Sequence, residues 1–172
     1  MEIGKVPEAV LKRAVFRQIH TRREEVLVGA GVGEDCAALQ LGPDEVFVLS
    51  TDPITGTDKN TGELAVQITA NDLASAGAEP VALLLTVLLP VTADEPMIRR
   101  LMKEVDEACE KLHIQVVGGH TEVTAVVNQP VISVTGIGKA KKGHLVTTGG
   151  AGIGDDVVAT KWIGIEGTSI IA

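Results

Sequence analysis

Residues 81–89 ("VALLLTVLL") constrain the fold more than any other stretch of this 172-residue chain. The run is apolar at both alternating positions, which is typical of a strand that is buried on both faces. It is also far shorter than the ~20 apolar residues that span a bilayer. We therefore expect a central strand that is covered on both sides, and no membrane segment.

The chain around this strand alternates helices with strands. A helix is predicted over residues 62–76, with Thr61 as its N-cap and Gly77 as its terminator. Amphipathic patterning predicts further helices over 94–112 and 7–20. The other strands are expected at residues 26–28, 36–41, 46–51, 114–119, 130–138 and 156–161. This order predicts an α/β (or α+β) domain with helices layered on a mixed sheet of four or more strands.

Composition excludes several classes of protein. The chain is 45% hydrophobic and 22% charged, as globular domains are, but only 2% aromatic, which argues against a base-stacking platform for nucleic acid. The net charge of −8 disfavours binding to nucleic acid or to an anionic membrane, although cations could still bridge the acidic protein to a nucleotide. The two cysteines, Cys36 and Cys109, have no CxxC spacing, which fits a reducing cytoplasm.

A glycine-rich segment over residues 142–154 has the composition of a linker or turn. The sequence after it, "DDVVATKWIGIEGTSIIA", contains a predicted strand and ends on an apolar run without a cap. We therefore expect residues 1–150 to form one domain and residues 151–172 to begin a second, truncated one.

Asp72 is misplaced in the helix predicted over 62–76. On a helical wheel it lies roughly 40° from Ile68, so that its carboxylate shares the apolar face. A buried carboxylate needs a partner, and the helix offers no Lys or Arg three or four residues away. The partner could be a basic residue from elsewhere, backbone N–H groups or a metal ion.

Other polar residues follow expected strands or turns. Asp35 lies in the glycine-rich "GAGVGEDCA", Asp52 comes just after a strand, and Gly118-Gly119 precede His120, where backbone N–H groups could face an anion. Several carboxylates close together need a cation, and Mg²⁺ takes carboxylates together with phosphate oxygens. The pattern therefore predicts a Mg²⁺–nucleotide site without a P-loop. Zinc-ligand spacing and a GxSxG elbow are missing, and a Cys36–His120 nucleophile pair ranks low for lack of an orienting group.

Four motifs in this order, "GVGEDCAAL", "STDPITG", "NDLASAGAEPVALLLTVLLP" and "VVGGHTEV", resemble the aminoimidazole-ribonucleotide synthetase (AIR synthase)-related superfamily. The resemblance covers roughly residues 25–140 and is nearest to HypE-like hydrogenase maturation factors, with thiamine-monophosphate kinases next. It implies an ATP-binding N-terminal domain whose helices lie on one face of the sheet. The other face would pair with a second subunit, forming a barrel at a homodimer interface.

The resemblance also implies the site. Asp35, Asp52 and Asp72 would hold Mg²⁺, and a further set would position the phosphates of ATP: Asn71, Gly118, Gly119, His120 and Thr121. The reaction would phosphorylate a carbonyl or phosphate oxygen of a small molecule or a protein tail. In HypE-like proteins this is the ATP-dependent dehydration of a carbamoyl group.

One departure from the family pattern concerns His120, which stands where thiamine-monophosphate kinases usually have Asp, and Glu122 is the candidate ligand in its place. A thiamine-monophosphate kinase-like phosphotransferase is therefore one alternative to the HypE-like reaction. A non-catalytic nucleotide-binding module that dimerises through the sheet is another.

Overall fold

The computed structural model describes residues 4–28, 30–31, 38–39, 42, 44–55, 60–146, 151–165 and 168. The strands are β1 (Gly4–Lys5), β2 (Val26–Val28), β3 (Ala38–Leu39), β4 (Glu45–Ile54), β5 (Glu79–Leu89), β6 (Gln115–Val123) and β7 (Val131–Lys141). The α-helices are α1 (Glu8–Ala14), α2 (Thr61–Ser75) and α3 (Glu95–Leu112), and short 3₁₀ turns cover Phe16–Gln18 and Lys142–His144.

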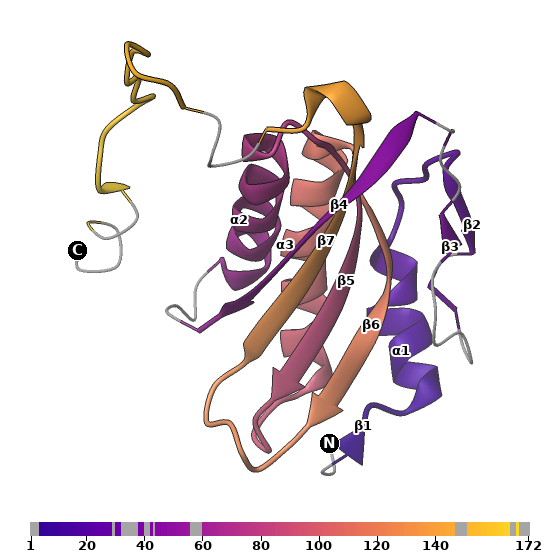
Figure 1. The fold of residues 1–172 in the computed structure, drawn as a ribbon. Helices are drawn as coiled ribbons and strands as arrows, with labels where there is room; N and C mark the ends of the chain where they lie inside the picture. The colour runs from indigo at the N-terminus through magenta and orange to yellow at the C-terminus, as the bar shows by residue number, and fades with distance from the viewer. Residues whose placement is uncertain are drawn as a thin grey trace.

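The main sheet has five strands in the order β1-β6-β5-β7-β4, and β2 pairs with β3 in a separate ribbon. β5 and β6 are parallel, whereas β7 pairs antiparallel with both β5 and β4. The apolar run at 81–89 therefore lies in the middle of the sheet, as predicted (Figure 1). This confirms a mixed α/β sheet of four or more strands.

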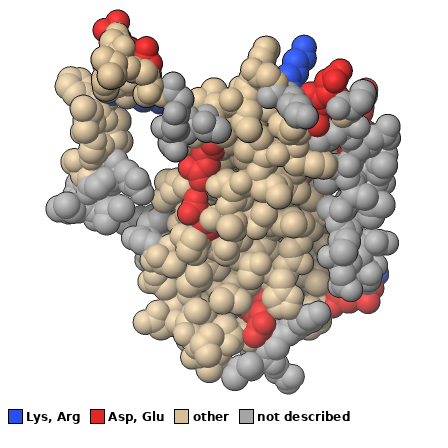
Figure 2. Space-filling model, in the orientation of Figure 1, with Lys and Arg blue, Asp and Glu red and all other residues tan. Residues whose placement is uncertain are grey.

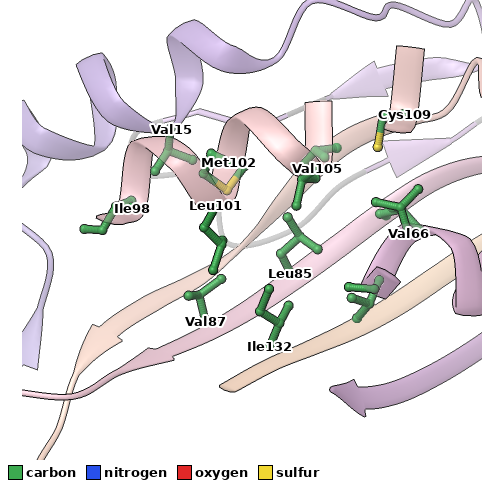
Figure 3. Close-up of a cluster of buried hydrophobic side chains, with 14 of the residues drawn as sticks. Val15, Val66, Leu85, Val87, Ile98, Leu101, Met102, Val105, Cys109 and Ile132 are labelled. Atoms are coloured by element: carbon green, nitrogen blue, oxygen red, sulfur yellow. The ribbon is translucent and has the colours of Figure 1, made fainter. Parts of the chain in front are cut away.

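The helices cover one face of the sheet (Figure 1). Leu85 and Val87 of β5 point toward Leu101 and Val105 of α3, with Val66 of α2 beside them (Figure 3). These side chains are buried, and each contributes about 1.5–3 kcal/mol when it leaves water. Their burial fixes α2 and α3 as a layer over the central strands.

The ends of α2 and α3 show which local signals the fold uses. Asp94 caps α3 by accepting a hydrogen bond from the Met97 backbone N–H at 2.9 Å. Gly77 follows α2 with a φ of 77°, as expected of a helix terminator. The predicted Thr61 cap is wrong, because α2 begins at Thr61 itself and its N-cap is Asn60 in the left-handed conformation.

The second face of the sheet, which we call the open face, is not covered by helices. Phe47 and Leu49 of β4 are 49% and 65% exposed there, and Thr86 of β5 is exposed as well. Figure 2 shows that the middle of this face carries almost no charged side chains. The prediction that residues 81–89 are covered on both sides is therefore wrong for the later part of this strand, where Thr86 is exposed. Nearer its start, Ala82 and Leu84 belong to a cluster with Val26 of β2.

Residues 156–161, which were predicted to form a strand, form none. They lie in a segment over 151–165 that runs away from the sheet (Figure 1), with exposed apolar side chains at Val157 and Trp162. A strand needs a neighbour for its backbone hydrogen bonds, and none of the described strands pairs with this segment. Within the described residues, no helix is long and apolar enough to cross a membrane.

Candidate functional site

Two of the three predicted metal ligands come together in the structure. Asp52 lies near the end of β4, Asp72 lies in the last turns of α2, and their carboxyl groups are in hydrogen-bonding contact. This contact, followed by partial desolvation and the charge of Asp72, raises the pKa of Asp52 above its ordinary value. We call Asp52 and Asp72 the acid pair.

The partner of Asp72 is a hydroxyl group, which was not among the predicted kinds of partner. The Ser50 hydroxyl donates to Asp72 Oδ2 at 2.8 Å. Ser50 and Asp52 are two residues apart on β4 and therefore face the same side of the strand. That spacing is the sequence signal that could have identified Ser50. Asp72 is also only half-buried, so its burial is less costly than the helical wheel suggested.

The acid pair offers the oxygen donors that Mg²⁺ prefers, namely two carboxylates and a nearby hydroxyl. Among the described residues, no Lys or Arg forms an ion pair with either aspartate. The same part of the chain holds no cluster of three or more His, Cys, Asp or Glu side chains. Asp35, the third predicted ligand, lies outside the described residues. The metal-binding role of all three aspartates stays a prediction.

The prediction that a strand ends at Gly118 and Gly119 is wrong, because both residues lie inside β6. Gly119 has a φ of 145°, and a Cβ at this position would lie 1.9 Å from the Leu85 carbonyl oxygen. The close approach of β6 to β5 therefore requires this glycine, whether or not a phosphate binds beside it. The physical reason for the wrong prediction is that a Gly-Gly pair fits a distorted strand as well as a loop.

The other predicted residues lie in β6 and on α2. His120 pairs in register with Thr86 of β5, and its Nε2 lies 3.2 Å from Glu122 Oε2 on the same strand. Thr121 also lies in β6, whereas Asn71 is exposed on α2, one position before Asp72.

The predicted site is split within one chain. We call Gly118–Thr121 of β6 the glycine motif. β6 and β4 are separated by β5 and β7, so three strand spacings, or roughly 14 Å, separate the glycine motif from the acid pair. The structure brings together Asp52 and Asp72, and it places Gly118, Gly119, His120 and Thr121 elsewhere. That these groups serve one nucleotide site stays a prediction.

The glycine motif instead lines a cavity of about 250 Å³ between the sheet and the N-terminal helix. Sequence reasoning missed this cavity, because its other walls come from aliphatic side chains that look like ordinary core, such as Leu11 and Val15. Their only signal was the apolar stripe of the helix predicted over 7–20.

Residues 33–140 match the family model described as AIR synthase related protein, N-terminal domain. A protein of Methanocaldococcus jannaschii named for hydrogenase expression/formation is 28% identical over 177 residues, which cover 98% of this chain and 51% of the relative. The thiamine-monophosphate kinase of Escherichia coli K12 is 29% identical over 162 residues, covering 89% and 46%.

Among solved structures, the hydrogenase maturation protein HypE in complex with ATP matches with a TM-score of 0.64 and 25% identity, covering 76% of this chain and 38% of that one. The chain spans about half the length of the curated relatives that it matches.

Proposed function

The chain belongs to the AIR synthase related family, whose N-terminal domain it contains, and on that basis we propose that it is the Mg²⁺–ATP-binding part of an enzyme that phosphorylates a carbonyl or phosphate oxygen. The observation that carries the proposal is the acid pair. Two carboxyl groups that are 20 positions apart meet, no Lys or Arg among the described residues pairs with either, and the pKa of Asp52 is raised. A fold gains nothing from such an arrangement unless a ligand completes it.

The residues present fit a magnesium ion. When bound, Mg²⁺ would supply positive charge that neutralises the triphosphate during transfer. Asp52 and Asp72 would hold the ion, and the Ser50 hydroxyl would keep the Asp72 carboxylate oriented through its 2.8 Å hydrogen bond. Asp35 would complete the set. Most of the rate enhancement in such a site comes from positioning and electrostatics and little from covalent chemistry of the protein.

We propose that the working unit is a homodimer that forms through the open face. The middle of this face, which carries almost no charged side chains, supports this arrangement (Figure 2). The exposed Phe47 and Leu49 support it further, since large apolar side chains on an uncovered sheet are typical of an interface.

The HypE-like reaction is our first choice for the whole enzyme, namely the ATP-dependent dehydration of a carbamoyl group on a protein tail. The relative named for hydrogenase expression/formation matches nearly the whole of this chain, and this favours it. A thiamine-monophosphate kinase-like activity is the second candidate, because the Escherichia coli kinase has a similar identity. Incubation of the full-length protein with ATP and thiamine monophosphate separates the two, since only the second candidate forms the diphosphate.

We also propose that residues 151–172 begin a second domain. Ile153, Val157 and Trp162 are almost fully exposed, and apolar side chains at this density are usually buried against another part of a protein. Catalysis would then need more of the enzyme than the domain over residues 1–150.

Asp72→Asn tests the proposal at the acid pair. Asn can still accept the hydrogen bond from Ser50 but is a poor metal ligand, so Mg²⁺-dependent ATP affinity should fall by about 10- to 100-fold. Titration calorimetry with and without Mg²⁺ measures this. Glu107→Gln is the matched control, because Glu107 is exposed on α3 and pairs with Lys103 at 3.5 Å on the same helix. Equal losses in both variants, or none in Asp72→Asn, would refute the site.

A further inference from the structure

The outer side of α2 has an unusual composition for a helix that faces solvent. Two of its 15 residues are charged, Glu63 and Asp72, whereas nine of the 18 residues of α3 are. A surface helix normally carries charged side chains on its outer side, as α3 does. α2 instead presents an uncharged stripe at positions three or four apart, which we call the α2 outer face: Leu64, Gln67, Asn71 and Ala74.

The α2 outer face is accessible in this structure, since Leu64, Asn71 and Ala74 are exposed and Gln67 is half-buried. A scarcity of charged residues is the feature of composition that marks the centre of a protein interface. The α2 outer face therefore has the composition of a surface that another part of a protein covers.

The segment over residues 151–165 is a second uncovered surface, and it is attached beside the first. The Val146 N–H donates to the Ala76 carbonyl at 3.0 Å, directly after the last turn of α2. A Cβ at Gly77 would lie 2.6 Å from the His144 carbonyl oxygen, so the chain passes closely over this end of the helix. The segment then lies on the α2 side of the molecule (Figure 1).

The tether is long enough for the two surfaces to meet. Seven residues from Val146 to Ile153 span at most about 25 Å, and the 15 residues of α2 are about 22 Å long. The exposed side chains of Ile153, Val157 and Trp162 can therefore reach any part of the α2 outer face.

A second copy of the chain fits this face less well. The open face has the larger exposed apolar side chains, Phe47 and Leu49, and it lies on the other side of the sheet from α2 (Figure 1). A homodimer through the open face therefore leaves the α2 outer face uncovered.

We propose that the α2 outer face is the docking surface of the second domain, and that the apolar side chains of residues 153–163 lie against it in the full-length enzyme. This inference rests on the proposed function, because that proposal makes residues 151–172 the beginning of the second domain. Docking buries Leu64 and brings the second domain to Asn71, one position before Asp72. The two halves of the enzyme then meet next to the acid pair.

Oxidative footprinting of the full-length protein, with the reaction of each side chain measured by mass spectrometry, tests the proposal without a substitution. Leu64 and Leu112 are 38% and 39% exposed in this structure, so they should react alike if α2 stays uncovered. We expect Leu64 to react severalfold more slowly than Leu112. Equal reactivity would overturn the proposal. Protection of Leu64 that is lost on dilution together with protection of Leu49 would also overturn it, because the occupant would then be a second copy.

Leu64→Glu in the full-length protein provides a second test, because it places a charge on the α2 outer face at a position that is exposed in this structure. It should raise the reactivity of Trp162 severalfold. Leu112→Glu is the matched control, since it makes the same change at an equally exposed position of α3. If Trp162 reacts at the wild-type rate in both variants, the segment does not lie on α2 and the proposal is wrong.

Calorimetric titration of the same wild-type preparation with Mg²⁺–ATP separates this proposal from the proposed function. A protein that binds Mg²⁺–ATP but leaves Leu64 as reactive as Leu112 rejects the docking surface and keeps the proposed function. A protein with protected Leu64 that does not bind Mg²⁺–ATP supports the docking surface and refutes the proposed function.

Discussion

Two groups of carboxylates lie beside the main sheet, and they differ in whether cationic side chains pair with them. Near the start of β5, Glu25 and Glu79 both accept hydrogen bonds from Arg23, at 3.0 and 2.7 Å, and Lys139 also pairs with Glu25. Hydrogen bonds from Arg23 and then Lys139 lower the pKa of Glu25 to about 2. At the edge of the sheet, no cationic side chain in the part of the chain that the structure describes pairs with the acid pair, and the pKa of Asp52 is raised.

The presence or absence of cationic partners distinguishes carboxylates that stabilise the fold from carboxylates that are candidates for ligand binding. Arg23 also donates its backbone N–H to the buried Gln115 at 3.0 Å, so the Glu25 cluster ties the segment before β2 to the sheet. Within the described ranges, the side chain of Asp72 is joined to the sheet by the hydrogen bond from Ser50. A cluster whose charges balance within the chain is explained by stability, and an unbalanced one is better explained by binding.

Glu25→Gln should give the largest effect on stability. It leaves Arg23 and Lys139 with only Glu79, and we expect a loss of about 2–3 kcal/mol in the free energy of unfolding at neutral pH. Because the folded pKa of Glu25 is about 2 against an ordinary 4.5, this contribution is present above pH 4.5 and is lost as the pH falls toward 2. Urea unfolding of wild type and variant across this range measures it.

Glu24→Gln serves as the control for this first prediction. Glu24 is the exposed neighbour of Glu25, and the substitution removes the same formal charge. It should change stability by less than about 0.5 kcal/mol. If the two variants lose the same stability, the cluster acts through net charge and not through its specific hydrogen bonds, and the contrast with the acid pair loses its basis.

This contrast also shows what the sequence could reveal. The central strand at 81–89, the helix over 94–112 and the meeting of Asp52 with Asp72 all followed from local patterns or motif order. The Arg23–Glu25–Lys139 cluster did not, because its members are brought together by strand pairing over 114 positions. Glu104 is similar, because its carboxylate accepts a hydrogen bond from the Gly62 N–H of α2 at 3.1 Å, and this contact between two helices has no local sequence signal.

The limits of the site prediction have the same origin. The motif order indicated which residues belong together but not which strands separate them. The strand order β6-β5-β7-β4 is a tertiary property, and it sets the distance between Gly119 and the acid pair. Sequence patterns that act over a few residues cannot encode that distance.

Ser50→Ala should have the second largest effect of the predictions made here, and the effect should be on ligand binding. Removing the hydroxyl frees the Asp72 carboxylate to rotate, so Mg²⁺-dependent ATP affinity should fall by about tenfold, less than in Asp72→Asn. Thr135→Val is a matched control, because its hydroxyl donates to Thr51 at 3.0 Å on the open side of β4, away from the acid pair. An unchanged affinity in Ser50→Ala would mean that Asp72 needs no orientation to bind the metal.

The smallest predicted effect concerns the pH dependence of the metal-free protein. A raised folded pKa means that the folded state holds a proton that the unfolded state would release, so Asp52 stabilises the fold increasingly as the pH falls through that pKa toward its ordinary 3.8. This is opposite in sign to the contribution of Glu25. In Asp72→Asn the repulsion is gone at every pH, so the variant should match or slightly exceed the stability of wild type near neutral pH.

The gap between Asp72→Asn and wild type should then shrink on acidification, as Asp52 becomes protonated in the wild type. Melting temperatures from about pH 7 to about pH 4, measured with a chelator present, give the comparison directly. Added Mg²⁺ should raise the melting temperature of wild type but not of the variant, since a ligand stabilises only the state that binds it. A variant that melts several degrees below wild type without Mg²⁺ would show that the fold uses the Asp72 carboxylate itself, and the acid pair would then resemble the Glu25 cluster after all.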